Sequence, residues 1–335
     1  MNVLVVRLDS FGDVLLAGPA VRAAARRASR LTVLCGPLGE PAARMLPGVD
    51  DVIVWQAPWE GTHPPPVDQA DVPGLVDALR ARALDAALVL TSFHQSPLPM
   101  ALLLRLAGVR SIGADSTDHA GQLLDVRHHR LPGRHEAEAA LDVTTAMGFA
   151  PAPGDDGRLR VLPPPDTAAL TGNGPYVVVH PGASAPARSW DAERHAEAVQ
   201  LLADAGHRVV VTGGPRETDL TRLVSGDVAI DLGGRTSPRK LAGVLAGADA
   251  LVCANTGPAH LAAAVGTPVV SLFAPVVPAE QWAPYGVPTV LLGDQRAGCA
   301  DTRARVCPVP GHPCLNGVTA HDVVSAVHKL LKESS

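Results

Sequence analysis

Residues 7–13 (RLDSFGD) contain the first side chains whose types and spacing could do chemistry. They follow a short apolar run and precede a helical pattern, so we expect them at the junction of a first strand and a first helix. Gly12 permits a tight turn and the close approach of a ligand. Asp13 then lies at the helix N-terminus, where its ionised carboxylate is favoured and can accept a proton from a hydroxyl group. Equally, Asp9 or Asp13 could serve only as a helix cap.

Residues 180–190 (HPGASAPARSW) form a second motif, after the first expected strand of the second half of the chain. Ser184 offers a hydroxyl group, and Arg188 offers a planar cationic fork that suits phosphate. Trp190 is expected to be a packing anchor at the start of the next helix. Alternatively, Arg188 is only an exposed charge that precedes a helix.

Residues 253–268 (CANTGPAHLAAAVGTP) form the most specific motif. Thr256 can cap the helix that follows, Gly257 lets the backbone approach a ligand, and Pro258 fits the first helical turn. The free amides of this turn form an anion site, which His260 can reach from one turn further on. The alternative is a core histidine or a simple cap, and the surrounding run favours the binding site over it.

Glu217 follows the glycine pair 213–214, after another expected strand. A carboxylate there could hold ribose hydroxyls, as acidic residues do in other nucleotide sites, or it could be only a charge at a helix N-terminus. No D-x-D sequence occurs in the chain, so there is no obvious carboxylate pair to hold a metal–diphosphate complex. We therefore expect no metal at the site.

Three of the five cysteines, Cys299, Cys307 and Cys314, lie near His312 in a proline-rich loop. Their wide spacing, with no C-x-x-C pair, favours a packed loop over a zinc site and leaves any role for them open. The odd number of cysteines, without a secretory signal, argues for reduced thiols. No apolar run approaches the roughly 20 residues of a membrane span, so we expect a cytoplasmic protein.

Composition and missing motifs exclude other classes. A formal net charge of -5 and an aromatic content of 3% argue against a nucleic-acid partner, which requires basic surfaces and stacking platforms. The absence of G-x-G-x-x-G after the first expected strand weakens a dehydrogenase assignment.

Short apolar runs alternate with helical patterns in both halves of the chain, which is typical of doubly wound α/β domains. In the first half we expect strands at 3–6, 31–34, 52–55 and 86–90, and helices at 74–83 and 98–107. In the second half we expect strands at 176–179, 207–212, 229–232, 250–254 and 268–273, and helices at 191–205, 216–224, 238–246 and 258–264. Thr319 and Asp322 form a capping box that opens a last helix.

The segment 150–175 is rich in proline and glycine, which indicates a linker or an extended crossing. We therefore predict an N-terminal domain at 1–155, a linker at 156–175, a C-terminal domain at 176–318 and a final helix at 319–335. Two such domains leave a cleft between them, and ligands bind at the carboxyl ends of the strands of open α/β sheets.

The three motifs, in their order and spacing, resemble the heptosyltransferase family, also called glycosyltransferase family 9. The resemblance spans nearly the whole chain. It implies a GT-B fold of two Rossmann-like α/β domains that face a central cleft, an inverting mechanism, and no required metal or cofactor. It also implies that the acceptor binds to the N-terminal domain and an ADP-activated heptose to the C-terminal domain.

The resemblance implies roles for individual residues. The family's base falls on Asp13, with Ser10 and Gly12 in the acceptor-side turn. Arg188 takes the place of a basic residue that is commonly lysine, and the pattern D-[ST]-G-x-x-H begins here with asparagine instead of aspartate. The predicted nucleotide-sugar site comprises Ser184, Glu217, Asn255, Thr256, Gly257 and His260.

The acceptor that the resemblance implies is the inner core of lipopolysaccharide, and a cell-wall or natural-product acceptor is the alternative. The partner is thus a glycan, a lipid-linked or a small-molecule acceptor. Four arginines of the first expected helix region could face an anionic sugar or membrane lipid, although a solvated helix face is favoured: Arg22, Arg26, Arg27 and Arg30. Two rival classes are a nucleotide-sugar epimerase of the same architecture and a non-catalytic sugar-nucleotide-binding protein.

Overall fold

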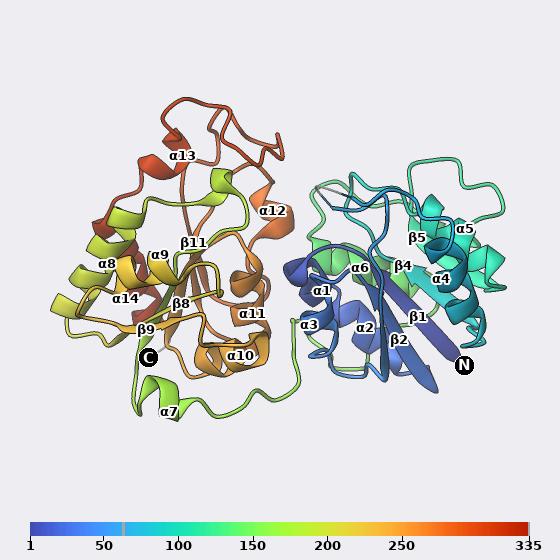
Figure 1. Ribbon diagram of the computed structural model, residues 1–335, viewed down its shortest axis with the longest axis horizontal. Helices are drawn as coiled ribbons and strands as arrows, with labels where there is room; N and C mark the ends of the chain where they lie inside the picture. The colour runs from blue at the N-terminus through green and yellow to red at the C-terminus, as the bar shows by residue number, and fades with distance from the viewer. Residues whose placement is uncertain (62–63, 334–335) are drawn as a thin grey trace. The chain divides into compact units, whose positions relative to one another are not determined.

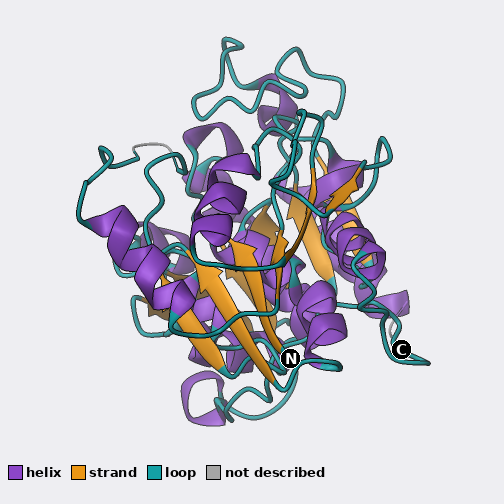
Figure 2. Ribbon diagram, turned by 90° about the vertical axis from the view of Figure 1, so that its right-hand side faces the viewer, coloured by secondary structure: helices purple, strands orange, loops and turns teal. Residues whose placement is uncertain are grey.

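The computed structural model describes residues 1–61 and 64–333, and it divides into two compact units, Met1–Leu162 and Pro163–Ser335 (Figure 1). The boundary between the units falls inside the predicted linker 156–175. Each unit contains one six-stranded parallel sheet with helices on both faces (Figures 1 and 2). In the part of the chain that is described, no helix is both long enough and apolar enough to span a bilayer.

The first sheet has the strand order β3-β2-β1-β4-β5-β6. Its strands are β1 (Asn2–Arg7), β2 (Arg30–Cys35), β3 (Asp51–Val54), β4 (Ala86–Val89), β5 (Ser111–Asp115) and β6 (Val126–His128). The helices of this unit are α1 (Phe11–Leu16), α2 (Gly18–Ala25), α3 (Glu40–Ala43), α4 (Asp71–Arg80), α5 (Leu98–Leu106) and α6 (Glu136–Ala146). Consecutive residues of β1 are buried on both faces of the sheet, which explains why its sequence is a continuous apolar run rather than an alternating one.

The second sheet repeats this plan with the order β12-β11-β10-β7-β8-β9. Its strands are β7 (Val177–His180), β8 (Val209–Gly213), β9 (Ile230–Gly233), β10 (Ala250–Ala254), β11 (Val269–Leu272) and β12 (Thr289–Leu292). Its helices are α7 (Ala168–Thr171), the 3-10 turn η1 (Pro186–Arg188), α8 (Ala192–Asp204), α9 (Thr218–Ser225), α10 (Pro238–Ala246), α11 (Gly257–Val265), α12 (Ala279–Trp282), α13 (Pro313–Asn316) and α14 (Ala320–Glu333).

The chain reverses its direction across each sheet once. In the first unit the chain moves from β1 outward to β3 and then returns to place β4 on the other side of β1. In the second unit it moves from β7 outward to β9 and then returns to place β10 beside β7. Loops on the two sides of such a reversal diverge at the carboxyl ends of the strands, which leaves a crevice in which ligands bind.

The final helix is part of the second unit. Thr319 and Asp322 form the predicted capping box, in which the Thr319 amide and hydroxyl both donate to the Asp322 carboxylate at 2.8 and 2.7 Å. Val323, Val327 and Leu330 of α14 are buried in the core between α8 and the sheet. The capping box and the apolar stripe together explain why residues 320–333 form a helix that packs on the second unit.

The expected strands and helices all correspond to observed elements, and several observed elements had no prediction. Strand β5 has the sequence SIGAD, and Met147 covers the bare backbone of Gly113 at its centre. A glycine in an apolar run weakens the strand signal, so the contact that stabilises this strand is not visible in the local sequence. Strands β6 and β12 are short and partly exposed, and they carry little periodicity.

The solvated face favoured for the four arginines agrees with the structure at Arg26, Arg27 and Arg30, which are exposed, while Arg22 is partly buried. Arg22 donates to the carboxylate of Asp155 at 2.9 Å and to the carbonyl of Arg158, while Arg26 and Arg27 donate to backbone carbonyls of residues 148–151. Arg30 is within 3.8 Å of Asp51. The segment 148–158 contains no helix or strand to satisfy its carbonyls, and the arginines supply those donors.

The cysteine-containing loop is packed, as expected. Cys299 and Cys314 are fully buried in the second core and Cys307 is partly buried against it. Trp190 is also buried there, with its indole N–H 3.3 Å from the carbonyl oxygen of Val318. The predicted packing roles of Trp190 and of this loop are therefore confirmed.

Two helical glycines predict opposite effects on stability. A Cβ atom at Gly243 in α10 would overlap the carbonyl oxygen of Pro165, whereas one at Gly74 in α4 would meet nothing within 4 Å. Gly74→Ala should therefore raise the free energy of unfolding by about 0.5–1 kcal/mol through helix propensity. Gly243→Ala should lower it by about 1–3 kcal/mol through overpacking. Urea denaturation of both variants checks this, and stabilisation by both changes would show that the segment at Pro165 does not rest on α10.

Candidate active site

Asp13 and Ser10 lie together at the start of α1. Ser10 is the N-cap, and its amide and hydroxyl donate to Oδ2 of Asp13 at 3.0 and 2.6 Å. Asp13 therefore caps the helix, and its other oxygen lies 3.5 Å from Nη2 of Arg7. Gly12 is inside the first turn of α1 and has no positive φ, so the tight turn expected at Gly12 is wrong. The chain enters the helix directly because the capping box satisfies its first amides.

Arg7 organises this edge of the first sheet, although the sequence analysis assigned it no role. It is the last residue of β1 and is 2% exposed. Its guanidinium lies 2.7 Å from Asp9, 3.5 Å from Asp13 and 3.3 Å from Glu136, and it donates to the hydroxyl of Ser92 at 2.8 Å. A buried cation requires such compensation. A charged residue that closes a run of buried apolar residues is the signal that could have identified it.

The ion pairs continue beyond Arg7. Glu136, the first residue of α6, is completely buried and also pairs with Arg130, which lies 3.3 Å from Asp115 at the end of β5. His128 of β6 lies 3.1 Å from the same aspartate. The network therefore joins the ends of β1, β5 and β6 through charged side chains. It fixes the position of Arg7, and with it the carboxylates that Arg7 contacts.

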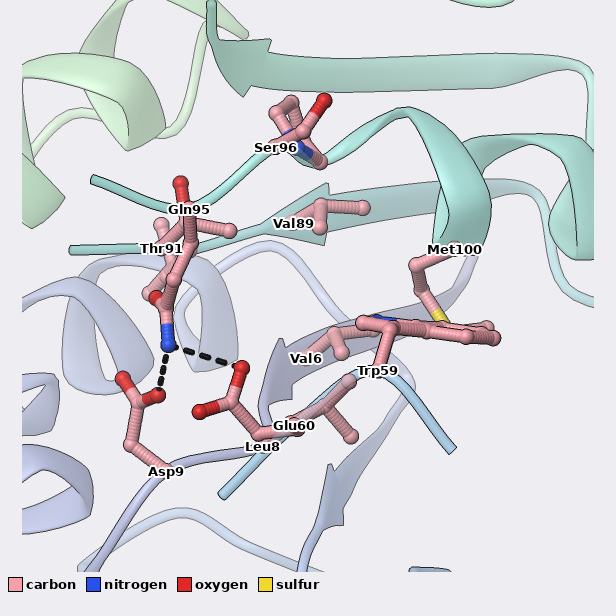
Figure 3. A pocket seen from close by; sticks show the side chains of 12 residues that line it. Val6, Leu8, Asp9, Trp59, Glu60, Val89, Thr91, Gln95, Ser96 and Met100 are labelled. Atoms are coloured by element: carbon pink, nitrogen blue, oxygen red, sulfur yellow. Dashed lines mark hydrogen bonds between the residues drawn. The ribbon is translucent and has the colours of Figure 1, made fainter. Parts of the chain in front are cut away.

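A pocket opens between the ends of β1 and β4, at the strand-order reversal (Figure 3). Gln95 donates from its side-chain amide to Asp9 and, at 2.8 Å, to Glu60, so two carboxylates converge on one amide group. Burial raises the pKa of Asp9 to about 7, with Arg7 opposing the shift and Asp13 and Glu60 adding to it. Glu60 and Gln95 were not predicted from the sequence.

In the second unit the loops after β7 and β10 are joined across the strand-order reversal. Arg188 donates from Nη1 to the carbonyl oxygen of Asn255 at 3.2 Å. The side chain of Asn255 is buried and exchanges hydrogen bonds with the backbone of Ala274, after β11. The structure therefore brings Arg188 to the N-terminal end of α11, as the two motifs require if they serve one ligand.

Thr256 occupies the N-cap position of α11, but the expectation that its side chain caps the helix was wrong. Its hydroxyl donates to the carbonyl oxygen of Ala254 at 3.3 Å and makes no cap hydrogen bond. Gly257 and Pro258 begin the helix, and His260 is buried one turn further on. A helix N-terminus without a side-chain cap keeps its first-turn amides directed at the crevice, which suits an anion.

Glu217 lies beside His180 at the ends of β8 and β7. Its Oε2 accepts a hydrogen bond from the amide of Gly214 at 2.6 Å and lies 4.0 Å from Nε2 of His180. Gly182 faces this carboxylate so closely that a Cβ atom there would overlap it. Burial lowers the pKa of His180, and the charge of Glu217 opposes that shift. Glu217 is thus held at the carboxyl ends of β7 and β8, at the N-cap position of α9.

Ser184 lies in the loop after β7 and is exposed, and its carbonyl oxygen is 3.3 Å from Nη2 of Arg305. The described part of the chain contains no group of three or more histidine, cysteine, aspartate or glutamate residues placed to hold a metal ion.

Two α/β units with ligand crevices at their strand-order reversals are the architecture of nucleotide-sugar transferases of the GT-B class. A family model for glycosyltransferase family 9 (heptosyltransferase) matches residues 74–312, more than half of the chain. The chain belongs to this family and is a glycosyltransferase. The sequence left open a glycosyltransferase, a nucleotide-sugar epimerase and a non-catalytic sugar-nucleotide-binding protein. Membership of this family supports the glycosyltransferase.

Curated relatives agree with this assignment. Lipopolysaccharide heptosyltransferase 1 of Escherichia coli O18:K1:H7 is 27% identical over 294 residues, which are 83% of this chain and 87% of that protein. Lipopolysaccharide heptosyltransferase 3 of Escherichia coli is 30% identical over 169 residues, 48% of each protein.

Solved structures confirm the fold. The glycosyltransferase family 9 protein of Veillonella parvula has a TM-score of 0.77 at 18% identity and covers 99% of this chain and 97% of its own. The E. coli ADP-heptose LPS heptosyltransferase II has a TM-score of 0.75 at 19% identity, with 100% and 99% covered. The predicted GT-B fold of Rossmann-like domains is therefore confirmed.

The raised pKa of Asp9 predicts a pH-dependent stability. An aspartate in the unfolded chain titrates near 3.9, so between about pH 4 and 7 the folded protein holds more protons than the unfolded chain. The free energy of unfolding of the wild type, relative to Asp9→Asn, should therefore fall as pH rises through this window, by up to about 1.4 kcal/mol per pH unit, and level off above it.

Urea denaturation of wild type and Asp9→Asn at several pH values measures this difference. A difference that does not change with pH, or one that grows as pH rises, would mean that the Arg7 ion pair outweighs burial and that Asp9 is ionised throughout.

Proposed function

We propose that this glycosyltransferase transfers a heptose or a closely related sugar from an ADP-sugar to a hydroxyl group of its acceptor, with inversion at the anomeric carbon. One observation carries the proposal. The predicted base motif and the predicted donor motifs each lie at a strand-order reversal, where open α/β sheets bind ligands. The matched relatives are described as lipopolysaccharide heptosyltransferases, and one similar structure is described as an ADP-heptose enzyme.

Asp13 is proposed as the general base. The acceptor oxygen attacks the anomeric carbon from the face opposite the diphosphate, the bond from that carbon to the diphosphate breaks, and ADP leaves. The acceptor proton passes to the Asp13 carboxylate. The Ser10 cap fixes one oxygen of that carboxylate, and Arg7 lies 3.5 Å from the other. A fixed carboxylate needs little reorganisation before it accepts a proton.

The donor is proposed to bind in the second unit. Arg188 and the first-turn amides of α11 would face the diphosphate, with His260 and Thr256 beside it. Glu217 would hold ribose hydroxyls from the end of β8, and Ser184 would reach a phosphate oxygen from the loop after β7. A fixed cation and oriented amides can stabilise the charge of a leaving diphosphate without a metal ion or another cofactor.

The acceptor is proposed to be a glycan, either lipid-linked as in lipopolysaccharide or a smaller molecule, and contact with a membrane surface would follow from a lipid-linked one. All five cysteines are free thiols, which supports the cytoplasmic location expected from the sequence. No nucleic acid is proposed as a partner.

Asp13→Asn should lower kcat by about 10²–10⁴-fold, because it removes the base and keeps the size of the side chain. ADP affinity should stay near the wild-type value, because the donor residues belong to the other unit. The assay measures ADP release from ADP-heptose that depends on an acceptor, with EDTA present throughout, and calorimetry measures ADP binding.

Ser10→Ala is the matched control, because it removes the hydroxyl that donates to the Asp13 carboxylate and keeps the carboxylate itself. It should lower kcat by less than about tenfold, in keeping with the cost of one hydrogen bond. Equal losses of kcat in both variants would mean that Asp13 serves only as a helix cap. A large loss of kcat in Asp9→Asn alone would assign the role of general base to Asp9. Turnover that requires added magnesium or manganese would refute the metal-free mechanism.

A further inference from the structure

Residues 299–314, which we call the clamp loop, belong to the long connection that follows β12 at the carboxyl edge of the second sheet (Figure 1, red, beside α13). Its two ends are fixed, because Cys299 and Cys314 are buried in the core. The residues between them are exposed or only partly buried. The course of this loop therefore depends largely on its hydrogen bonds.

The backbone of the clamp loop is strained at three places. Asp301, Arg303 and His312 have positive φ values of 60°, 57° and 47°. Among residues 1–61 and 64–333, Ala83 is the only other non-glycine residue with a positive φ. Such conformations cost free energy and persist only where the surrounding structure imposes them, which is common at functional sites.

Each of these three residues donates a hydrogen bond to a loop that borders the proposed donor crevice. The amides of Asp301 and Arg303 donate to the carbonyl oxygens of residues 275–276, after β11, at 2.9 and 2.7 Å. Nε2 of His312 lies 3.1 Å from the carbonyl oxygen of Ala187, in η1. A carbonyl oxygen can only accept, so Nε2 carries the proton and donates it. The strained residues are therefore the ones that hold the loops after β11 and β7.

Ala187 is held through both of its backbone polar groups. Its carbonyl oxygen accepts from His312, and its amide donates to the carbonyl oxygen of Arg305 at 2.9 Å. Nη2 of Arg305 also donates to the carbonyl oxygen of Ser184 at 3.3 Å. Ala187 directly precedes Arg188, whose guanidinium reaches the loop before α11. The clamp loop thus fixes the backbone from which Arg188 extends.

We infer that the clamp loop positions the donor site, and that His312 is the positioning residue for Arg188. His312 acts through the backbone of Ala187 and not on the ligand itself. It keeps the Arg188 guanidinium beside the start of α11 before the diphosphate binds. An arginine that is already held in place loses less conformational freedom on binding, so positioning raises affinity without a new contact to the ligand. The inference rests on the proposed function, because it takes Arg188 to be a ligand of the diphosphate.

Two substitutions separate the hydrogen bond of His312 from its backbone strain. Glutamine carries its amide nitrogen as many bonds from Cα as Nε2 of histidine, so His312→Gln can still donate to Ala187. Asparagine is one bond shorter, so His312→Asn loses this hydrogen bond, although asparagine tolerates a left-handed backbone better than glutamine does. If the role were only structural, ADP affinity would follow the free energy of unfolding. Positioning makes it follow the hydrogen bond instead.

Calorimetry on the full chain measures ADP binding, and urea denaturation gives the free energy of unfolding of each variant. His312→Asn should raise the Kd for ADP about five- to tenfold, in keeping with the loss of one hydrogen bond, and His312→Gln should stay within about twofold of the wild type. His321→Asn, the same change at an exposed position of α14, should leave the Kd unchanged. In an Arg188→Ala background, His312→Asn should have almost no further effect, because His312 acts through Arg188.

An ADP affinity of His312→Asn equal to that of the wild type would overturn the inference and leave the proposed function standing. The same holds for equal losses in both His312 variants, and for an undiminished effect of His312→Asn in the Arg188→Ala background.

Hydrogen–deuterium exchange without nucleotide tests the clamp independently of the donor. His312→Asn should speed exchange at residues 184–190, and His312→Gln should not. Unchanged exchange at these residues in His312→Asn would also overturn the inference. Faster exchange there, in a protein whose wild type binds no ADP, would support the clamp on Arg188 and refute the proposed donor, so the two can fail separately.

Discussion

A parallel sheet whose strand order reverses cannot close its carboxyl edge at the reversal, because the loops there lead to helices on opposite faces. This chain contains the constraint twice, between β1 and β4 and between β7 and β10. Each crevice must be lined by the loops that begin there, and those loops carry the three motifs. The remaining helices and strands fix the positions of these loops. Glycine, proline and capping residues occur in them because the backbone must turn sharply from a strand into a helix.

The two crevices differ in electrostatic character, and the difference matches the two halves of a sugar transfer. In the second unit a cation and the start of a helix meet, through Arg188 and α11, and Glu217 lies further along the edge. That arrangement suits a diphosphate joined to a ribose. In the first unit carboxylates outnumber cations around Arg7, which suits proton acceptance and a polar acceptor. Arg7 keeps these carboxylates in place while its own charge is fully neutralised.

Features that depend on neighbouring residues could be predicted from the sequence. The Thr319–Asp322 box, the position of Asp13 at a helix start and the strand–helix alternation all follow from spacings of a few residues. Features that depend on distant residues could not. Arg7 and Glu136 are 129 positions apart, and Gln95 is 86 positions from Asp9, so no local pattern reports that these residues meet. The prediction for Thr256 was wrong although it rested on a local pattern. Threonine is a typical N-cap residue, but here its hydroxyl donates to the carbonyl oxygen of Ala254 and not to the helix.

Hydrogen–deuterium exchange of the full chain with and without ADP tests most directly whether the donor binds to the second unit and the base lies in the first. The account predicts slower exchange at residues 181–190, 213–217 and 255–260, where the donor motifs lie, and unchanged exchange at residues 8–13 and 91–97. Protection at residues 8–13 and 91–97, with none in the three segments of the second unit, would contradict it. ADP would then bind beside Asp9 and Asp13, and the assignment of base and donor to separate units would be wrong.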